Sequence, residues 1–424
     1  MKKLILLVTL SASTSYGIGL KEAIKGAIQN NPRTTAIDLR MQAMQDRKKA
    51  QYMDLLPSLH IGSSANFSQN QMAGGTSRST SYGNNVGVSM NLYNGGADVE
   101  SLRAAEERLK ATDAEYNSSN SQIPNTRGRF ASSVFESYIS LVENYEQKNF
   151  VVDLKKKLEF LQKAHLNEEE RETLNQRITD LETSMVNVDY GISEAQKDFT
   201  YFTTLPAPQA LDLESFDQLR SGLVIPENAE KAFQIALEKS PDIQSMNHRL
   251  AAETHEREAD KRKLFRPRVD LNASYNDNTS RGDSGPSVNS KGAYVGVSLT
   301  YTIGAGSVYR NRAGNKELEA TRSERDATLA DVQYSLNARY HALANQEKVQ
   351  SLQQQNLQTA DTRLATIFKK IEKGDKIEFK DMIAAVDTRS NYWQSNLQLK
   401  RNIIAARFNL QRTVGTLFDE ITFQ

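Results

Sequence analysis

Four stretches of the chain alternate between apolar and small polar residues, which is the pattern of a β-strand with one apolar and one polar face. In one of them Val86, Val88 and Met90 alternate with Gly87 and Ser89. The alternation predicts strands at residues 58–68, 86–94, 268–277 and 294–303. Each of these strands should therefore have one apolar side that needs a cover.

Long helices account for most of the remaining sequence. Two stretches, Ala97 to Ala164 and Gly306 to Lys373, are each about 68 residues long, or roughly 100 Å of helix. In the second, positions spaced seven residues apart are apolar with one polar exception: Leu329, Leu336, Leu343, Gln350, Leu357, Leu364 and Ile371. Such a row is typical of a coiled-coil seam. Pro124 interrupts the first stretch, and we expect a kink there because proline is unfavourable inside a helix.

The sequence contains an internal two-fold repeat. Val86-Gly87-Val88-Ser89-Met90 recurs about 210 residues further on as Val295-Gly296-Val297-Ser298-Leu299, and Asn31-Pro32 recurs as Ser240-Pro241. Each copy reads as a helix, two strands and a long helical hairpin. The predicted organisation is a first repeat at 18–205, an equatorial linker at 206–225 and a second repeat at 226–424.

The first 17 residues have the pattern of a secretory signal peptide. Lys2 and Lys3 precede the apolar run Leu4 to Leu10, and Ser15-Tyr16-Gly17 is a small-residue cleavage site. The chain has 53 basic and 52 acidic residues, so its charge does not indicate a nucleic-acid partner. It has no cysteine, which excludes disulfides, thiolate metal sites and a lipid-modified N-terminal cysteine. No later segment has 18 consecutive apolar residues, as a membrane helix would need.

The alternating strands are instead typical of a transmembrane β-barrel. The stretches 68–85 and 278–293, rich in Ser, Asn and Gly, resemble external barrel loops. A half-buried strand in a soluble sandwich is a commoner source of alternation, but the coiled coil offers no second sheet. Four strands cannot close a barrel, and an open edge in lipid leaves backbone groups unpaired. Three copies would give twelve strands around a lumen lined by small polar positions, which include Ser64, Ser89, Asn272 and Ser298.

The predicted fold class is therefore mixed. A long α-helical coiled-coil barrel is combined with a transmembrane β-barrel that a trimer shares, with four strands from each chain. The rival prediction is a secreted coiled-coil scaffold or adhesin without a pore. It explains the heptads, but it explains neither the four strands nor their repetition.

Motifs of enzymes are incomplete in this chain. His255-Glu256 lacks the second histidine of a zinc helix, because Ala259 occupies that position. Gly304 and Gly306 lack the third glycine of a dinucleotide loop, because Tyr309 replaces it. We therefore expect no enzyme activity, no cofactor and no metal site.

Several short motifs occur in their expected order along the two repeats. They are Leu55-Leu56-Pro57-Ser58-Leu59, Leu92-Tyr93-Asn94-Gly95-Gly96, Lys373-Gly374-Asp375 and Thr413-Val414-Gly415-Thr416-Leu417. With them, the mature chain resembles the TolC family of outer-membrane efflux proteins over essentially its whole length. The resemblance implies a homotrimer in outer-membrane lipid with a tunnel in the periplasm. It implies the exit duct of a tripartite efflux or type I secretion system, with a periplasmic adaptor (membrane fusion) protein and an inner-membrane pump as partners.

The resemblance also implies three functional positions. Leu166 and Gly374 fall on the adaptor-docking tips, and Asp381 falls on the periplasmic gate. Only Leu166 matches the family's first tip, and the acidic run 168–172 is either a solvated helix start or a partner-specific contact. Asp381 is either part of the gate or an aspartate that the helix dipole favours. The cargo is open, because multidrug efflux and protein secretion share one kind of duct.

Overall fold

A computed structural model describes residues 18–72, 75–118, 126–164, 166–282, 286–301 and 305–419. The chain divides into two compact units. The helical unit comprises Met1–Ile37, Glu115–Gln244 and Leu329–Gln424, and the strand unit comprises Asp38–Ala114 and Ser245–Thr328. Each predicted repeat contributes to both units. The predicted signal peptide at 1–17 lies outside the described residues.

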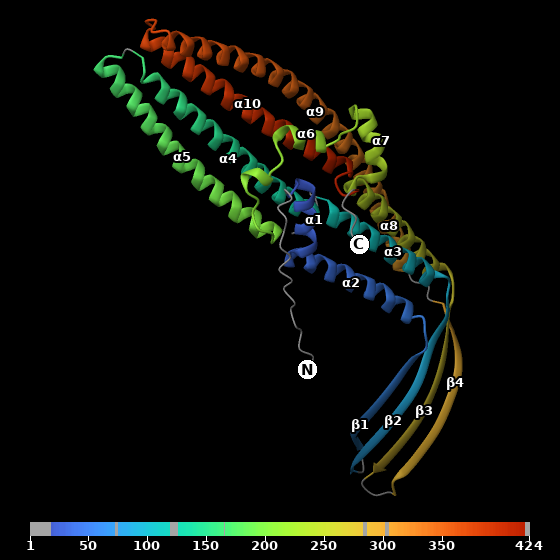
Figure 1. Cartoon of the computed structure of the whole chain (residues 1–424). Helices are drawn as coiled ribbons and strands as arrows, with labels where there is room; N and C mark the ends of the chain where they lie inside the picture. The colour runs from blue at the N-terminus through green and yellow to red at the C-terminus, as the bar shows by residue number, and fades with distance from the viewer. Residues whose placement is uncertain are drawn as a thin grey trace. The chain divides into compact units, whose positions relative to one another are not determined.

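The strand unit contains one four-stranded antiparallel sheet in the order β1-β2-β3-β4 (Figure 1). Its strands are β1 (Ser58–Met72), β2 (Gly75–Asn94), β3 (Arg268–Gly282) and β4 (Val288–Thr300). The register places Leu59 opposite Val88, Val88 opposite Ala273, and Ala273 opposite Val295. All four strands therefore turn their apolar positions to one face, as the alternation predicts.

The strands continue well beyond their predicted ends, and the predicted loops at 68–85 and 278–293 are wrong. β1 reaches Met72 and β2 begins at Gly75, so nearly all of the first predicted loop is strand. Small polar side chains pair across this part of the sheet, as in the 2.7 Å contact between the hydroxyls of Ser68 and Ser79. Cross-strand hydroxyl pairs stabilise a ladder in the absence of apolar side chains.

A β-bulge alters the predicted apolar row of β2. The register shifts between Asn91 and Tyr93, so Tyr93 rather than Leu92 lies opposite Val269. An extra residue in one strand leaves one position unpaired. Leu92 is the unpaired residue, so it does not continue the apolar row of Val86, Val88 and Met90.

Two glycines with positive φ, Gly95 (62°) and Gly96 (78°), connect β2 to helix α3 (Ala97–Asn117). Arg266 donates to the carbonyl oxygen of Gly95 (2.9 Å), and Arg262 of α8 (Pro241–Phe265) donates to that of Gly96 (3.2 Å). A Cβ on Gly95 would lie 2.7 Å from the Cβ of Arg266. Glycine is thus required here both for the backbone angle and for the close approach of α8. The remaining helices of the strand unit are most of α2 (Pro32–Met53) and the first part of α9 (Ala305–Glu372).

The helical unit is built on two hairpins. One consists of α4 (Arg127–Leu161) and α5 (Glu168–Thr203), and the other of α9 and α10 (Phe379–Val414). In this unit α9, α10, α4 and α5 run side by side in that order (Figure 1). The shorter elements are α1 (Leu20–Asn30), the 3-10 turn Ala210–Asp212, α6 (Phe216–Gly222) and α7 (Ala229–Lys239).

Aromatic pairs join the two hairpins. Phe150 of α4 stacks on Trp393 of α10 with ring centroids 3.8 Å apart, and Phe135 stacks on Phe408 at 4.1 Å. Near the hairpin ends one apolar cluster takes residues from α4, α5, α9 and α10, including Leu158, Leu174, Leu364 and Met382. The two hairpins therefore share one core there.

The long helices agree with the predictions only in part. α9 is one unbroken helix of 68 residues. The predicted helix from Ala97 to Ala164 is wrong, because α3 ends at Asn117 and α4 begins at Arg127. The Thr126 hydroxyl accepts from the backbone N–H of Arg129 (3.2 Å), which is a proper N-cap for a new helix. Pro124, where we expected a kink, lies outside the described residues. Among the described residues, every helix is too polar or too short to cross a bilayer.

Candidate functional site: the two faces of the sheet and the hairpin ends

The polar face of the sheet collects small, mostly uncharged side chains. Ser89 lies opposite Asn272, Ser64 lies opposite Gly83, and Ser298 lies opposite Asp270, two positions along β3 from Asn272. Side chains alternate strictly along a strand, so the four positions predicted to line a pore share this face. Asn85 donates to Asn276 across the same face (2.6 Å). This surface suits contact with water.

The opposite face is apolar and open to its surroundings. Ile61 is 76% exposed and Val297 is 65% exposed. Monomeric soluble proteins rarely expose an apolar surface that continues over four strands. Its chemistry suits contact with lipid.

Exposed tyrosines bound this apolar face along the strands. Tyr82 and Tyr93 lie eleven positions apart on β2, about 35 Å along the strand at ~3.3 Å per residue. With the ~40° tilt usual in membrane barrels, this becomes roughly 27 Å along the membrane normal, close to the ~25 Å apolar band of such barrels. Tyr275 on β3 and Tyr301 directly after β4 are also exposed. Aromatic residues at both limits of an apolar band are the usual girdles of a membrane barrel.

The end of the first hairpin combines an apolar contact with an acidic surface. Leu166 is partly buried and packs against the shared core of the hairpins. Asn167 caps α5, since its side chain accepts from the Glu170 N–H (2.8 Å) and Glu170 accepts from the Asn167 N–H (2.9 Å). Within the predicted acidic run, Glu170 therefore has a capping role. Glu168, Glu169 and Glu172 are exposed.

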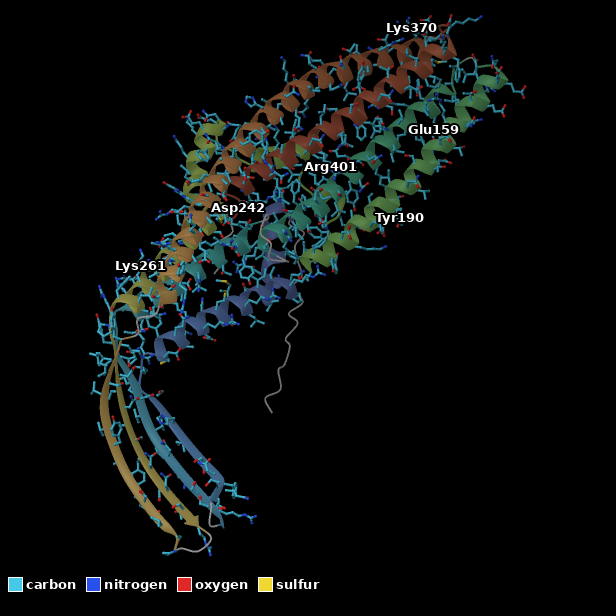
Figure 2. All side chains as sticks on the ribbon, turned by 180° about the vertical axis from the view of Figure 1, so that it is seen from behind. Glu159, Tyr190, Asp242, Lys261, Lys370 and Arg401 are labelled. Carbon is cyan, nitrogen blue, oxygen red and sulfur yellow. The ribbon has the colours of Figure 1, made fainter. Side chains whose placement is uncertain are left out.

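The end of the second hairpin is a Schellman turn. Gly374 has a φ of 77°, and its N–H donates to the Ile371 carbonyl (3.0 Å), while the Asp375 N–H donates to the Lys370 carbonyl (3.0 Å). Lys370 is labelled near this end of α9 in Figure 2. A Cβ on Gly374 would meet nothing within 4 Å, so the glycine serves the backbone angle alone.

The predicted gate residue, Asp381, lies in the first turn of α10 with an exposed side chain. Ala384, one turn further, is exposed on the same side, whereas Met382 and Ile383 are buried in the core. Asp381 therefore occupies the solvent side of α10. Its position is compatible both with a gate and with a helix-start residue.

The sequence profile of the family described as "Outer membrane efflux protein" matches residues 23–153 and 232–415, about three quarters of the chain. The two matched segments fall in the two predicted repeats. The chain belongs to the outer membrane efflux protein family. It is thus a TolC-like efflux channel of the outer membrane, a transport protein and not an enzyme. The rival prediction of a scaffold or adhesin is wrong.

Solved channels of this family have the same fold. CusC superposes with a TM-score of 0.72 at 15% identity, over 96% of this chain and 95% of that one. MtrE of Neisseria gonorrhoeae, in its open state, gives 0.71 at 16% identity over 96% and 93%. VceC of Vibrio cholerae gives 0.71 at 14% identity over 93% and 96%. No curated protein matches the sequence significantly.

Ion pairs connect the two hairpins of this channel protein, and the residues that form them were not predicted from the sequence. Arg389 of α10, 8% exposed, donates to Asp361 of α9 (2.5 Å) and to Asp153 of α4 (3.0 Å). Arg401, labelled in Figure 2, donates to Glu143 of α4 (2.7 Å). The sequence does carry a sign of this buried charge, because Arg389 and Asn396 are the polar members of a row of buried residues on α10 that lie seven positions apart. The row is Met382, Arg389, Asn396, Ile403 and Leu410.

The strand unit of this efflux-family chain buries a charged cluster between α3 and α8. Glu100 accepts from His255 (2.7 Å) and pairs with Arg103 (3.0 Å) and Arg262 (3.1 Å). Burial alone would raise the pKa of Glu100, but the hydrogen bond from His255 and the charges of both arginines outweigh it and lower that pKa. His255, considered above as a zinc ligand, is thus a hydrogen-bond partner of Glu100. Among the described residues, no group of three or more His, Asp or Glu side chains could hold a metal ion.

Proposed function

We propose that three copies of this chain form the exit duct of a tripartite export system. The observation that carries the proposal is the four-stranded sheet, whose edge strands are β1 and β4 and whose apolar face is exposed. Backbone groups left unpaired in lipid cost several kcal/mol each, so β1 of one copy pairs with β4 of the next. Twelve strands then close into a barrel that is wide enough for a water-filled lumen.

The polar face of the sheet lines that lumen. Ser64, Ser89, Asn272 and Ser298 provide hydroxyl and amide groups that hydrogen-bond to the water of the lumen, while the apolar face contacts outer-membrane lipid. Residues 1–17 direct the chain across the inner membrane and are removed.

The outer edges of the helical layer support the same assembly. Tyr190 of α5, labelled in Figure 2, is 66% exposed, and Tyr334 of α9 is 77% exposed. α5 and α9 are the two outer members of the row of four helices (Figure 1). In a ring of copies, α5 of one chain meets α9 of the next, and this contact covers both tyrosines.

The hairpin ends dock the periplasmic adaptor, which links the duct to an inner-membrane pump. Leu166 and Gly374 mark the two docking ends, and exposed Glu168, Glu169 and Glu172 give the first end an acidic surface. Three copies of Asp381 form a ring at the periplasmic gate, where their mutual repulsion favours bound cations.

The oligomeric state and the pore can be tested together. The protein is extracted from outer membranes in detergent, its mass is determined by light scattering, and it is inserted into planar bilayers. We expect a trimer with discrete, stable conductance. A folded, monodisperse monomer without conductance would contradict the proposal.

A further inference from the structure

The start of α1 lies against a carboxylate that is distant in sequence. The backbone N–H of Leu20 donates to Glu214 (2.8 Å), and a Cβ on Gly19 would lie 3.5 Å from the same carboxylate group. Gly19 is the N-cap of α1 and offers no side chain for that purpose. Glu214 therefore caps α1 from the segment that precedes α6.

Tyr138 fixes the residue before this cap. Its side chain is 0% exposed, and its hydroxyl donates to the carbonyl oxygen of Ile18 (3.0 Å) and accepts from the backbone N–H of Glu214 (3.1 Å). Burial raises the pKa of the Tyr138 hydroxyl, and the negative charges of Glu214 and Glu22 raise it further. Ile18 is thus held at a position where the surroundings are negative. A cavity of about 410 Å³ begins at the next residue, Gly19, and its charged lining residues are Lys21, Glu22 and Glu214.

We propose that cleavage after Gly17 leaves the α-ammonium group of Ile18 in this niche, where it forms an ion pair with Glu214. The inference rests on the signal peptide included in the proposed function. In the uncleaved chain the nitrogen of Ile18 belongs to a neutral peptide bond. Hydrolysis of that bond by a signal peptidase gives the carboxylate of Gly17 and the free amine of Ile18, which is protonated near neutral pH.

The ion pair with Glu214 also offsets the repulsion between the new ammonium group and the start of α1. A positive charge beside the N-terminus of a helix opposes the positive end of the helix dipole. Glu214 already accepts from the first N–H of α1, so one carboxylate neutralises both the helix end and the new ammonium group. A chain cut several residues earlier or later would place its ammonium beyond the reach of Glu214. The niche therefore favours a mature terminus at Ile18 or directly beside it.

The experiment uses the full-length protein, processed in cells and purified from outer membranes. Its intact mass should correspond to a chain that begins at Ile18. The rate at which an amine-reactive reagent labels that terminus, followed by peptide mass spectrometry over a pH series, reports the pKa of the amine. The expected pKa lies above the ordinary range of about 7.7–8.0.

Two variants separate the charge of Glu214 from its capping role. Glu214→Gln keeps an acceptor for the Leu20 N–H and removes the charge, so labelling at pH 7 should become about tenfold faster for each unit by which the amine pKa falls. Asp217→Asn removes an exposed carboxylate from the same part of the chain and should leave the rate unchanged.

Three results would overturn the proposal: a mature chain that starts elsewhere, an ordinary pKa for the terminal amine in the wild type, or equal labelling of wild type and Glu214→Gln. If Glu214→Gln does not accumulate, the wild-type titration alone decides. Neither readout depends on conductance or on trimer formation, so failure here is distinct from failure of the proposed duct.

Discussion

A lysine substitution on each face of β4 provides a strong test of the strand assignment. Val297 lies on the apolar face opposite Leu271, and its neighbour Ser298 lies on the polar face opposite Asp270. Val297→Lys and Ser298→Lys therefore introduce the same charge one residue apart. If the apolar face contacts lipid, only the first should be excluded from the membrane.

The expected difference is large. Val297 lies four positions before Tyr301 and two positions after Val295, well inside the apolar band. A lysine at the midplane of a barrel costs about 2–4 kcal/mol, which becomes roughly 6–12 kcal/mol for three copies. This is comparable to the whole folding free energy of a typical domain, about 5–15 kcal/mol. Ser298→Lys stays in the watery lumen beside Asp270, which already pairs with Arg268 (2.8 Å), so a second ion pair there should contribute no more than about 0–1 kcal/mol.

The assay compares outer-membrane yield and heat-modified migration of the two variants, followed by bilayer recording of whichever assembles. Val297→Lys should be depleted from the membrane fraction. Ser298→Lys should assemble, and its single-channel current should become less cation-selective. Equal yield and unchanged current for both variants would refute the assignment of the two faces.

Three further predictions concern the helices. Gly415→Ala should lower the free energy of unfolding by about 3 kcal/mol or more, because φ is 89° and the new Cβ would lie 2.0 Å from the Lys239 carbonyl oxygen. Gly374→Ala also has a positive φ but open space around the new Cβ, so it should cost only about 1 kcal/mol. Thermal unfolding of the two variants measures the difference. Glu100→Gln should lower the free energy of unfolding at pH 7 by about 1–3 kcal/mol, the cost of leaving buried donors without an acceptor. The pKa of Glu100 in the folded protein lies below its ordinary value of 4.5, so its carboxylate stabilises the wild type above pH 4.5. This contribution to the free energy of unfolding is lost as the pH falls through the folded-state pKa. An acid titration followed by circular dichroism should therefore show a smaller loss of stability in the variant than in the wild type. Asp381→Ala should weaken cation preference and raise single-channel conductance, whereas identical currents would remove Asp381 from the gate.

The strand faces could be predicted from sequence because alternation has only one solution once a strand exists. Val86 and Val88 on β2, and Val295 and Val297 on β4, lie on one face in any register that keeps one side apolar. The two-fold repeat added a second copy of the same evidence. The family resemblance then connected the strands to a channel, which the profile match confirms.

The strand ends could not be predicted because the signal itself disappears there. Beyond Phe67, β1 continues through Ser68 and Gln69, and β2 begins among Ser and Thr residues. Polar residues on both faces look like a loop in sequence, although they pair across the ladder in the structure. The bulge at Asn91 is hidden for a related reason, since it depends on the opposing strand β3 and not on β2 alone.

The functional positions were less accessible to sequence reasoning than the fold. Gly374 was placed on a turn by its motif, and its φ of 77° gives the physical reason for a glycine there. The acidic run at 168–172 had two open interpretations, and the structure divides it, because Glu170 caps α5 while its neighbours are exposed. The gate role of Asp381 stays a prediction, since an exposed first-turn aspartate fits both a gate and a helix start.

The polar residues within the helical core show where such reasoning ends. Arg389 interrupts an apolar row on α10, which signals a buried charge, but a heptad row cannot say which carboxylates neutralise it. Its partners Asp153 and Asp361 come from two different helices, one of them in the other hairpin. A buried arginine without these carboxylates would cost several kcal/mol, so its presence requires that α4, α9 and α10 meet at this level. The stack of Trp393 on Phe150 lies directly beside it, and the Arg389 guanidinium also lies over the Phe150 ring at 5.3 Å. The two hairpins are therefore held together here by the ion pair between Arg389 of α10 and Asp153 of α4 as well as by apolar packing. This pairing of residues that are distant in sequence exists only in the folded chain.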